Sequence, residues 1–211
     1  MAHFTIFFTF IIGFAMGMNG VSTHTLINDF SCFKQNGLNY AMVRAYLNFG
    51  QVDPNAKQTL IAAEQYKLKY AHAYINPCVQ CKFEPEFQIT QVVEALKGAN
   101  YGGIFIMVQT NDRWSSNKNG NCLYINTLIK AVHKYGYMAG VGSDSALWDT
   151  IMGKECMVPE EDVACWWIKH DKEQSLDHFK PFAGFTFPSI KEYDGPANVC
   201  TQEVDLNFCN C

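Results

Sequence analysis

Short apolar runs alternate with amphipathic segments along most of this chain, and this alternation narrowly limits how the chain can fold. Residues 40–46 and 70–75 are apolar runs of strand length, and each precedes a segment with apolar residues at helical spacing. Strands that alternate with helices pair in parallel through crossover connections. The pattern therefore predicts an α/β fold with a parallel sheet.

Helix ends are marked in the sequence by capping and breaking residues. The first predicted helix has Asp53 as N-cap and Pro54 at its first position. The second covers residues 85–97 and ends at Gly98, and the third covers about 121–134. The further strand candidates are residues 104–108, 137–142, 163–168, 182–187 and 203–206.

About seven or eight strands within the chain predict an irregular (β/α) TIM-like barrel with parallel strands and some missing helices towards the end. An open doubly wound sheet is the alternative. That alternative is weakened because no Gly-rich phosphate loop follows the first strand.

The start of the chain predicts a secretory signal peptide. Residues 4–14 form an apolar run of the length of a signal h-region, and Ala15 and Gly17 offer small residues for cleavage, although no Lys or Arg precedes the run. A membrane-spanning helix would need about 20 apolar residues. We therefore assign residues 1–17 to a signal peptide and residues 18–211 to one domain. The mature protein is expected to be secreted, outside the cell or in the lumen of the secretory or endolysosomal pathway, without membrane association.

Nine cysteines support an oxidising compartment, because this number is unusual for a cytosolic protein. Cys78 and Cys81 form a C-x-x-C pair, and Cys209 and Cys211 form a C-x-C pair. The two pairs lie too far apart for zinc-finger spacing, so disulfides are the favoured interpretation. An odd number leaves one thiol free, paired between chains, or buried as a small apolar group.

Charge and motif content exclude several classes of function. A net charge of −4 without any Lys/Arg cluster argues against nucleic acid as a main partner. The six histidines are scattered, so neither a metal site nor a cofactor is predicted. The sequence contains no G-x-S-x-G motif, so it does not indicate a serine nucleophile. The sequence makes no prediction of oligomeric state.

Aromatic, amide and hydroxyl side chains follow the predicted strands, where the site of a barrel lies. Sugars present apolar faces to aromatic rings and hydroxyls to amides. The functional hypothesis for these residues is therefore a carbohydrate-binding site. For any single aromatic, however, the favoured interpretation is that it closes the barrel. The candidate substrate-binding residues are Tyr74, Asn111, Trp148, Trp166, Trp167, Glu192 and Tyr193.

An ordered set of segments resembles the secreted lysozymes of glycoside hydrolase family 25 (GH25), in the form found in protists and nematodes. The segments are residues 30–46, 52–81, 114–117, 145–153, 165–195 and 203–207. The resemblance implies an irregular (β/α) barrel that cleaves peptidoglycan between N-acetylmuramic acid and N-acetylglucosamine. It also implies disulfides between Cys78 and Cys81 and between Cys32 and Cys200.

The catalytic positions implied by this resemblance have lost their acids. The first strand of the family reads V-D-V-S, and its Asp corresponds to Gly20. The central strand ends in D-x-E, and these places hold Met107 and Gln109. Only Asp205, in V-D-L-N, keeps its carboxylate. Gln has no proton to donate at a useful pKa, and Met cannot stabilise positive charge.

Three functions follow from these observations. The favoured one is a secreted, catalytically inactive lysozyme-like protein that binds bacterial cell-wall glycan or another carbohydrate in innate defence or digestion. The second is an active muramidase with relocated acids, for which Asp205 and Glu192 are the candidates. The third is a structural secreted domain with a filled cleft.

Overall fold

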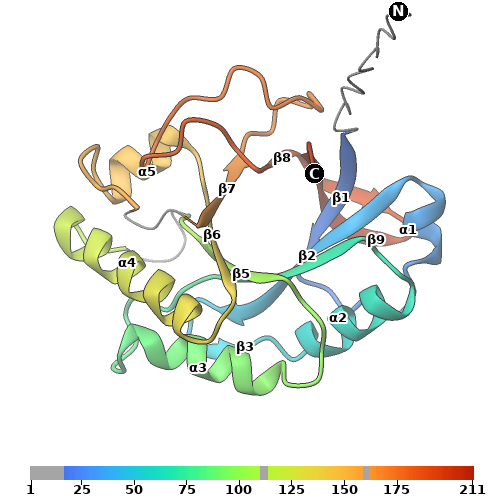
Figure 1. The fold of residues 1–211 in the computed structure, drawn as a ribbon, viewed down its shortest axis with the longest axis horizontal. Helices are drawn as coiled ribbons and strands as arrows, with labels where there is room; N and C mark the ends of the chain where they lie inside the picture. The colour runs from blue at the N-terminus through green and yellow to red at the C-terminus, as the bar shows by residue number, and fades with distance from the viewer. Residues whose placement is uncertain (1–16, 110–113, 159–161) are drawn as a thin grey trace, which may run out of the picture.

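The computed structural model describes residues 17–109, 114–158 and 162–211. Within these ranges eight strands close into a barrel, which Figure 1 shows nearly end-on, with the two-residue strand β3 (Gln51–Val52) at its edge. The barrel strands are β1 (Met18–Thr23), β2 (Leu38–Leu47), β4 (Tyr70–Ile75), β5 (Gly103–Met107), β6 (Met138–Ser143), β7 (Val163–Ile168), β8 (Ile190–Val199) and β9 (Gln202–Cys209). Residues 1–16 of the predicted signal peptide and the candidate site residue Asn111 lie outside the described residues.

Most neighbouring barrel strands are parallel, as the alternating sequence predicts. β2, β4, β5, β6, β7 and β8 pair in parallel in this order, and β1 closes the ring on β2. β9 is antiparallel to both β8 and β1, so the barrel is mixed. β9 follows β8 through a short turn, and this connection is too short to contain the crossover helix that a parallel strand would need.

Helices cover the part of the barrel built from the middle of the chain, as Figure 1 shows. They are α1 (Ser31–Gln35), α2 (Ala56–Gln65), α3 (Pro85–Ala95), α4 (Lys118–Lys134) and α5 (Ser145–Ile151). α3 has Pro85 in its first turn, and Gly98 just beyond it has φ +88°. The described part of the segment between β7 and β8 has no helix, so the prediction of missing helices towards the end is confirmed.

Two local predictions are wrong. α2 begins at Ala56 because the Asp53 carboxylate accepts hydrogen bonds from Asn55 N (3.0 Å) and Arg44 Nε (2.8 Å) instead of capping a helix. Residues 182–187 form no strand: Ala183 and Gly184 both have positive φ, which turns the chain back on itself. The strand β8 was not predicted, because its buried Lys191 and Glu192 hide the apolar pattern.

Apolar side chains fill two separate layers. One layer lies between the strands and the surrounding helices and includes Leu60, Ile89 and Ile129. The other fills the barrel interior and consists of Tyr40, Met42, Tyr74, Phe105, Met107, Trp166, Ile190 and Cys209. Strands buried on both faces require continuous apolar runs, and these runs made the strands recognisable.

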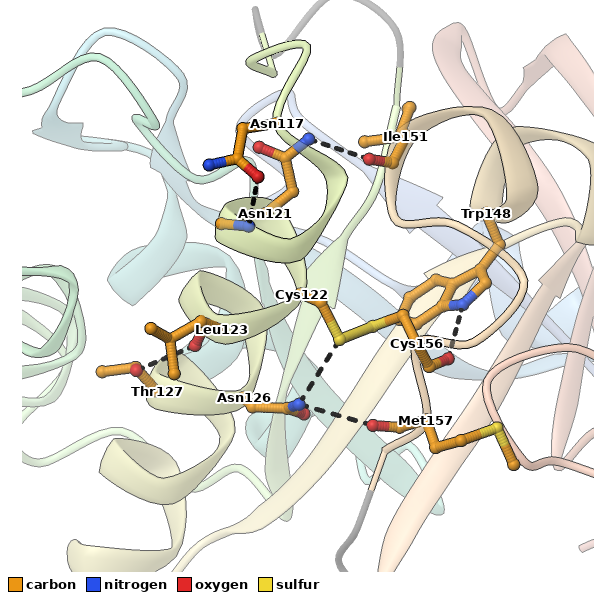
Figure 2. Close-up of a disulfide and its surroundings, with 11 residues drawn as sticks. Asn117, Asn121, Cys122, Leu123, Asn126, Thr127, Trp148, Ile151, Cys156 and Met157 are labelled. Carbon is orange, nitrogen blue, oxygen red and sulfur yellow. Dashed lines mark hydrogen bonds between the residues drawn. A yellow bond between two sulfur atoms is a disulfide. The ribbon is translucent and has the colours of Figure 1, made fainter.

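Four disulfides join the described residues. The pairs Cys32–Cys200 and Cys78–Cys81 confirm the two expected bridges. Cys209 pairs with Cys211, and Cys122 of α4 pairs with Cys156 after α5, as Figure 2 shows. The ninth cysteine, Cys165, is buried in β7 without a disulfide partner among the described residues, and burial raises the pKa of its thiol. In the described ranges, no helix combines the length and the apolar character that spanning a membrane requires.

Candidate functional site at the barrel mouth

The carboxyl ends of the parallel strands surround a mouth with a buried hydrogen-bond network. Ser22 of β1 donates from Oγ to Glu192 Oε2 of β8 at 2.7 Å. Asn207 of β9 donates from Nδ2 to Ser22 Oγ at 3.0 Å and accepts from Trp166 Nε1 at 2.8 Å. We call Ser22, Glu192 and Asn207 the mouth network. All three are at least 95% buried, so each polar atom needs its partner.

His170, just beyond β7, contacts the second oxygen of Glu192. Its Nε2 lies 3.0 Å from Glu192 Oε1, and 41% of its side chain is exposed. The hydrogen bond to Glu192 raises the pKa of His170, and partial burial opposes this rise. Glu192 therefore has a polar partner on each oxygen, and its carboxylate is held in one orientation.

Asp205 is the second acid of the mouth. It pairs with Ser22 across the β1–β9 ladder, and its carboxylate occupies the space where Gly195 would carry a Cβ. Burial raises the pKa of Asp205 to about 7, the negative charge of Glu192 adds to the rise, and His170 opposes it. A carboxyl that keeps its proton near neutral pH can donate a hydrogen bond or a proton.

Asp205→Asn should change how stability depends on pH. The pKa of Asp205 in the folded protein is about 7, above the ordinary value of 3.8 for this side chain. A raised acid pKa means that the native state binds more protons, so stability falls as pH rises between these values. Between about pH 4.5 and about pH 8, the natural protein should lose ~1–3 kcal/mol more unfolding free energy than the variant, allowing for partial exposure.

Urea titrations at the two pH values measure this difference. Asp177→Asn, at an exposed acid of the segment between β7 and β8, is the matched control and should leave the pH dependence as in the natural protein. Equal pH dependence in the Asp205 variant and the natural protein would contradict the raised pKa.

Several predicted aromatic residues line the barrel interior and offer little surface. Tyr74 packs edge-on against Trp166 with ring centroids 5.4 Å apart, and their exposed fractions are 8% and 1%. The Tyr193 hydroxyl accepts a hydrogen bond from Gln174 Nε2 at 3.1 Å. Tyr74 and Trp166 therefore belong to the packed interior of the barrel and offer little surface to a ligand.

Trp167 instead borders a pocket of about 280 Å³ beside the mouth, which also includes Asp144, Lys169 and Lys180. The Lys191 ammonium lies 4.7 Å from the centre of the Trp167 ring, so one face of the indole is covered. Lys191 itself is 1% exposed and donates to Asp171 Oδ1 at 2.7 Å. Among the predicted aromatics, Trp167 is the one that borders this polar pocket.

Trp148 does not take the predicted position in a ligand site. It is fully buried on α5, and its Nε1 donates to the Cys156 carbonyl at 3.0 Å (Figure 2). Its ring packs against Phe182, with centroids 5.7 Å apart. The indole therefore belongs to the core and holds the loop that carries Cys156.

Three residues of the mouth were not among the predicted site residues: Ser22, His170 and Asn207. Ser22 lies where the family reads V-D-V-S, and Asn207 ends the V-D-L-N segment, so the family resemblance was the available signal for both. His170 follows β7 with no periodic pattern that marks it. No group of three or more His, Cys, Asp or Glu side chains among the described residues could hold a metal ion.

Comparisons with known proteins agree with this architecture. The family model described as "Lysozyme-like protein 1" matches residues 13–193. The chain is 30% identical to "Probable GH family 25 lysozyme 4" of Dictyostelium discoideum over 214 residues, covering 99% of both chains. The chain belongs to the GH25 lysozyme-like family.

Solved structures of the GH25 family share the fold at low identity. A family GH25 lysozyme from Aspergillus fumigatus superimposes with a TM-score of 0.69 at 11% identity, covering 93% of this chain and 95% of that one. The modular autolysin LytC from Streptococcus pneumoniae, solved with a synthetic peptidoglycan ligand, gives 0.66 at 16% identity. That match covers 91% of this chain and 46% of the autolysin.

The GH25 catalytic positions inferred from the sequence lie on the strands around the mouth. A Cβ on Gly20 would lie 2.5 Å from the Tyr40 ring, so no side chain fits there unless Tyr40 moves. Met107 is 2% exposed, and its sulfur fills the space where Gly142 would carry a side chain. Gln109 lies half-buried just beyond β5. Two of the three positions are therefore closed by apolar packing.

Proposed function

We propose that this GH25-family chain binds peptidoglycan-type carbohydrate at the barrel mouth and does not cleave it. The observation that carries the proposal is the packing at Gly20 and Met107, where the family pattern has carboxylates. Tyr40 occupies the space beside Gly20, and the Met107 sulfur occupies the space beside Gly142. Hydrolysis of a glycosidic bond requires an acid and usually a second carboxylate close to it.

The two acids that remain are arranged in a way that favours binding. Glu192 is held between Ser22 and His170 and is 5% exposed. Asp205 can donate a hydrogen bond near neutral pH because its pKa is about 7. Asp205 can therefore pair with a sugar oxygen without any covalent step, while Glu192 holds Ser22 and His170 in place beside it.

A second candidate function is glycoside hydrolysis with Asp205 as general acid and Glu192 as its carboxylate partner. One observation favours it, namely the raised pKa of Asp205, because a general acid must hold a proton at working pH. The two hydrogen-bond partners of Glu192 oppose it, since they occupy the oxygens that would have to reach a substrate.

The proposed setting is the outside of the cell or a secretory or endolysosomal lumen, in defence against bacteria or in their digestion. Four disulfides support this setting because such bonds persist in oxidising compartments.

Binding to insoluble peptidoglycan tests the proposal in a sedimentation assay. The natural protein should sediment with the polymer, and Trp167→Ala should weaken binding by about tenfold or more, since an aromatic side chain beside a pocket supplies a large share of contact area. Leu123→Ala, at a 71% exposed leucine of α4, is the matched control and should bind normally. Absence of the natural protein from the pellet would leave the structural-domain function as the better account.

A further inference from the structure

The pocket beside the mouth that Trp167 borders carries an excess of positive charge. We call it the Trp167 pocket, and its volume is about 280 Å³. Lys169 and Lys180 line it, and Asp144 is the one acid among the described residues that line it. This local charge is opposite to that of the whole chain, whose formal net charge is −4. The pocket therefore differs in charge from the protein as a whole.

The negative charge of Asp144 is already engaged at the start of α5. Its Oδ1 accepts hydrogen bonds from Ala146 N at 2.7 Å and from Leu147 N at 3.0 Å, as the side chain of an N-cap residue does. Asp144 therefore leaves much of the lysine charge in the pocket without a matching anion.

Neither lysine ammonium of the pocket has an acid partner among the described residues. In these ranges no carboxylate lies within ion-pair distance of Lys169 Nζ or Lys180 Nζ, and no group accepts a hydrogen bond from either. Lys191, which covers one face of Trp167, shows the contrast, because it is buried and donates to Asp171 Oδ1 at 2.7 Å. The two pocket lysines are exposed, so their flexible side chains can turn toward a bound group.

The Trp167 pocket adjoins the mouth network through β7 and β8. The Lys169 N–H donates to the Glu192 carbonyl at 2.9 Å, so the backbone of Lys169 is fixed beside this acid. The next residue, His170, contacts the Glu192 carboxylate at 3.0 Å. Asp144 and Lys169 directly follow β6 and β7, at the carboxyl ends of the strands that surround the mouth (Figure 1). A ligand whose sugar lies at the mouth can therefore place a substituent in the pocket.

The side chains of the pocket match an anionic group on a carbon chain. Two ammonium groups from separate segments attract an anion, and each can donate hydrogen bonds that charge strengthens. This attraction extends over about 8 Å at physiological ionic strength, so it reaches an anion held in a pocket of this size. The Trp167 ring supplies an apolar wall for the carbon atoms that carry the anion.

We propose that the Trp167 pocket binds a carboxylate on the peptide substituent of the carbohydrate whose sugar lies at the mouth. This inference rests on the proposed carbohydrate function and names the substituent that the same site recognises. Peptidoglycan carries free carboxylates on the short peptides attached to its sugars. Lys169 and Lys180 hold the carboxylate, and the Trp167 ring borders the chain that carries it.

Titrations with muramyl dipeptide and with its methyl ester test the proposal. The two compounds share the sugar and the peptide, and only the first carries a carboxylate. At low ionic strength the natural protein should bind the dipeptide about 3- to 10-fold more tightly than the ester, as two exposed ion pairs would provide. High salt should reduce this preference, because it screens exposed charges. Ligand-observed NMR measures both dissociation constants.

Two double variants locate the effect. Lys169→Gln with Lys180→Gln should abolish the preference by weakening dipeptide binding and leaving ester binding unchanged. Both side chains are exposed, so the fold should be retained. Lys57→Gln with Lys130→Gln is the matched control, because it removes the same charge from exposed positions of α2 and α4. The control should keep the preference of the natural protein.

Equal binding of the two compounds by the natural protein would overturn this inference and leave the carbohydrate function standing. A preference that survives the loss of both pocket lysines would place the carboxylate elsewhere and overturn it too. Loss of the preference in the control variant would reduce it to an effect of overall charge, with the same consequence. If neither compound binds, this inference fails, and the sedimentation assay with insoluble peptidoglycan decides the carbohydrate function separately.

Discussion

Purified protein added to a suspension of bacterial cell walls should leave the turbidity unchanged over a period in which an active GH25 lysozyme clears it. Loss of a general acid alone costs about 10²- to 10⁴-fold in rate. The family resemblance implies that Gln109 takes the place of the acid and that Gly20 and Met107 take the places of its carboxylate partners. Turbidity at constant protein concentration measures this difference directly.

Restoring acids provides the comparison for this experiment. Met107→Asp with Gln109→Glu returns two carboxylates, and we expect any gain to remain far below an active lysozyme. Gly20→Asp should not complete the site, because its Cβ would lie 2.5 Å from the Tyr40 ring. Lysis by the natural protein would contradict the non-hydrolytic proposal. Loss of that lysis in Asp205→Asn would then assign catalysis to the relocated acids.

Trp148→Ala should destabilise the protein strongly. The side chain is fully buried, packs on Phe182 and donates a hydrogen bond to the Cys156 carbonyl. Truncation of a buried Trp removes its contacts and leaves a cavity, which costs ~3–5 kcal/mol of unfolding free energy. Urea unfolding followed by circular dichroism measures the loss.

Leu123→Ala is the comparison, because Leu123 also lies on a helix but is 71% exposed. Its unfolding free energy should stay within about 0.5 kcal/mol of the natural value. A loss below about 1 kcal/mol for Trp148→Ala would show that the indole is not a core element and would return it to the candidate ligand-binding residues.

Strands with apolar residues on both faces were predictable. β4 and β7 begin and end at the predicted residues, because burial on both sides requires an unbroken apolar run. β8 could not be found in this way, since it carries Lys191 and Glu192 inside the protein. Lys191 is stabilised there by Asp171, a partner on a distant loop that no local pattern reveals.

The candidate site, like the strands, was only partly predictable from the sequence. The places of Gly20, Met107 and Gln109 came from a resemblance carried by ordered segments, and the structure then showed why two of them are closed. Tyr40 and Gly142, which decide this, belong to neighbouring strands. Trp148 was misplaced because a tryptophan just after a strand end has the same appearance in sequence whether it faces a ligand or the core.

Residue type and local spacing were enough to predict the alternation of strands and helices and the class of barrel. The loss of acids at the GH25 catalytic positions was implied by the family resemblance and stays a prediction. The pairing of polar groups at the mouth instead required the folded chain. Ser22 and Glu192 are 170 residues apart and lie 2.7 Å from each other. Their contact depends on barrel closure through the antiparallel strand β9, and on the strand register that places Asn207 beside Ser22.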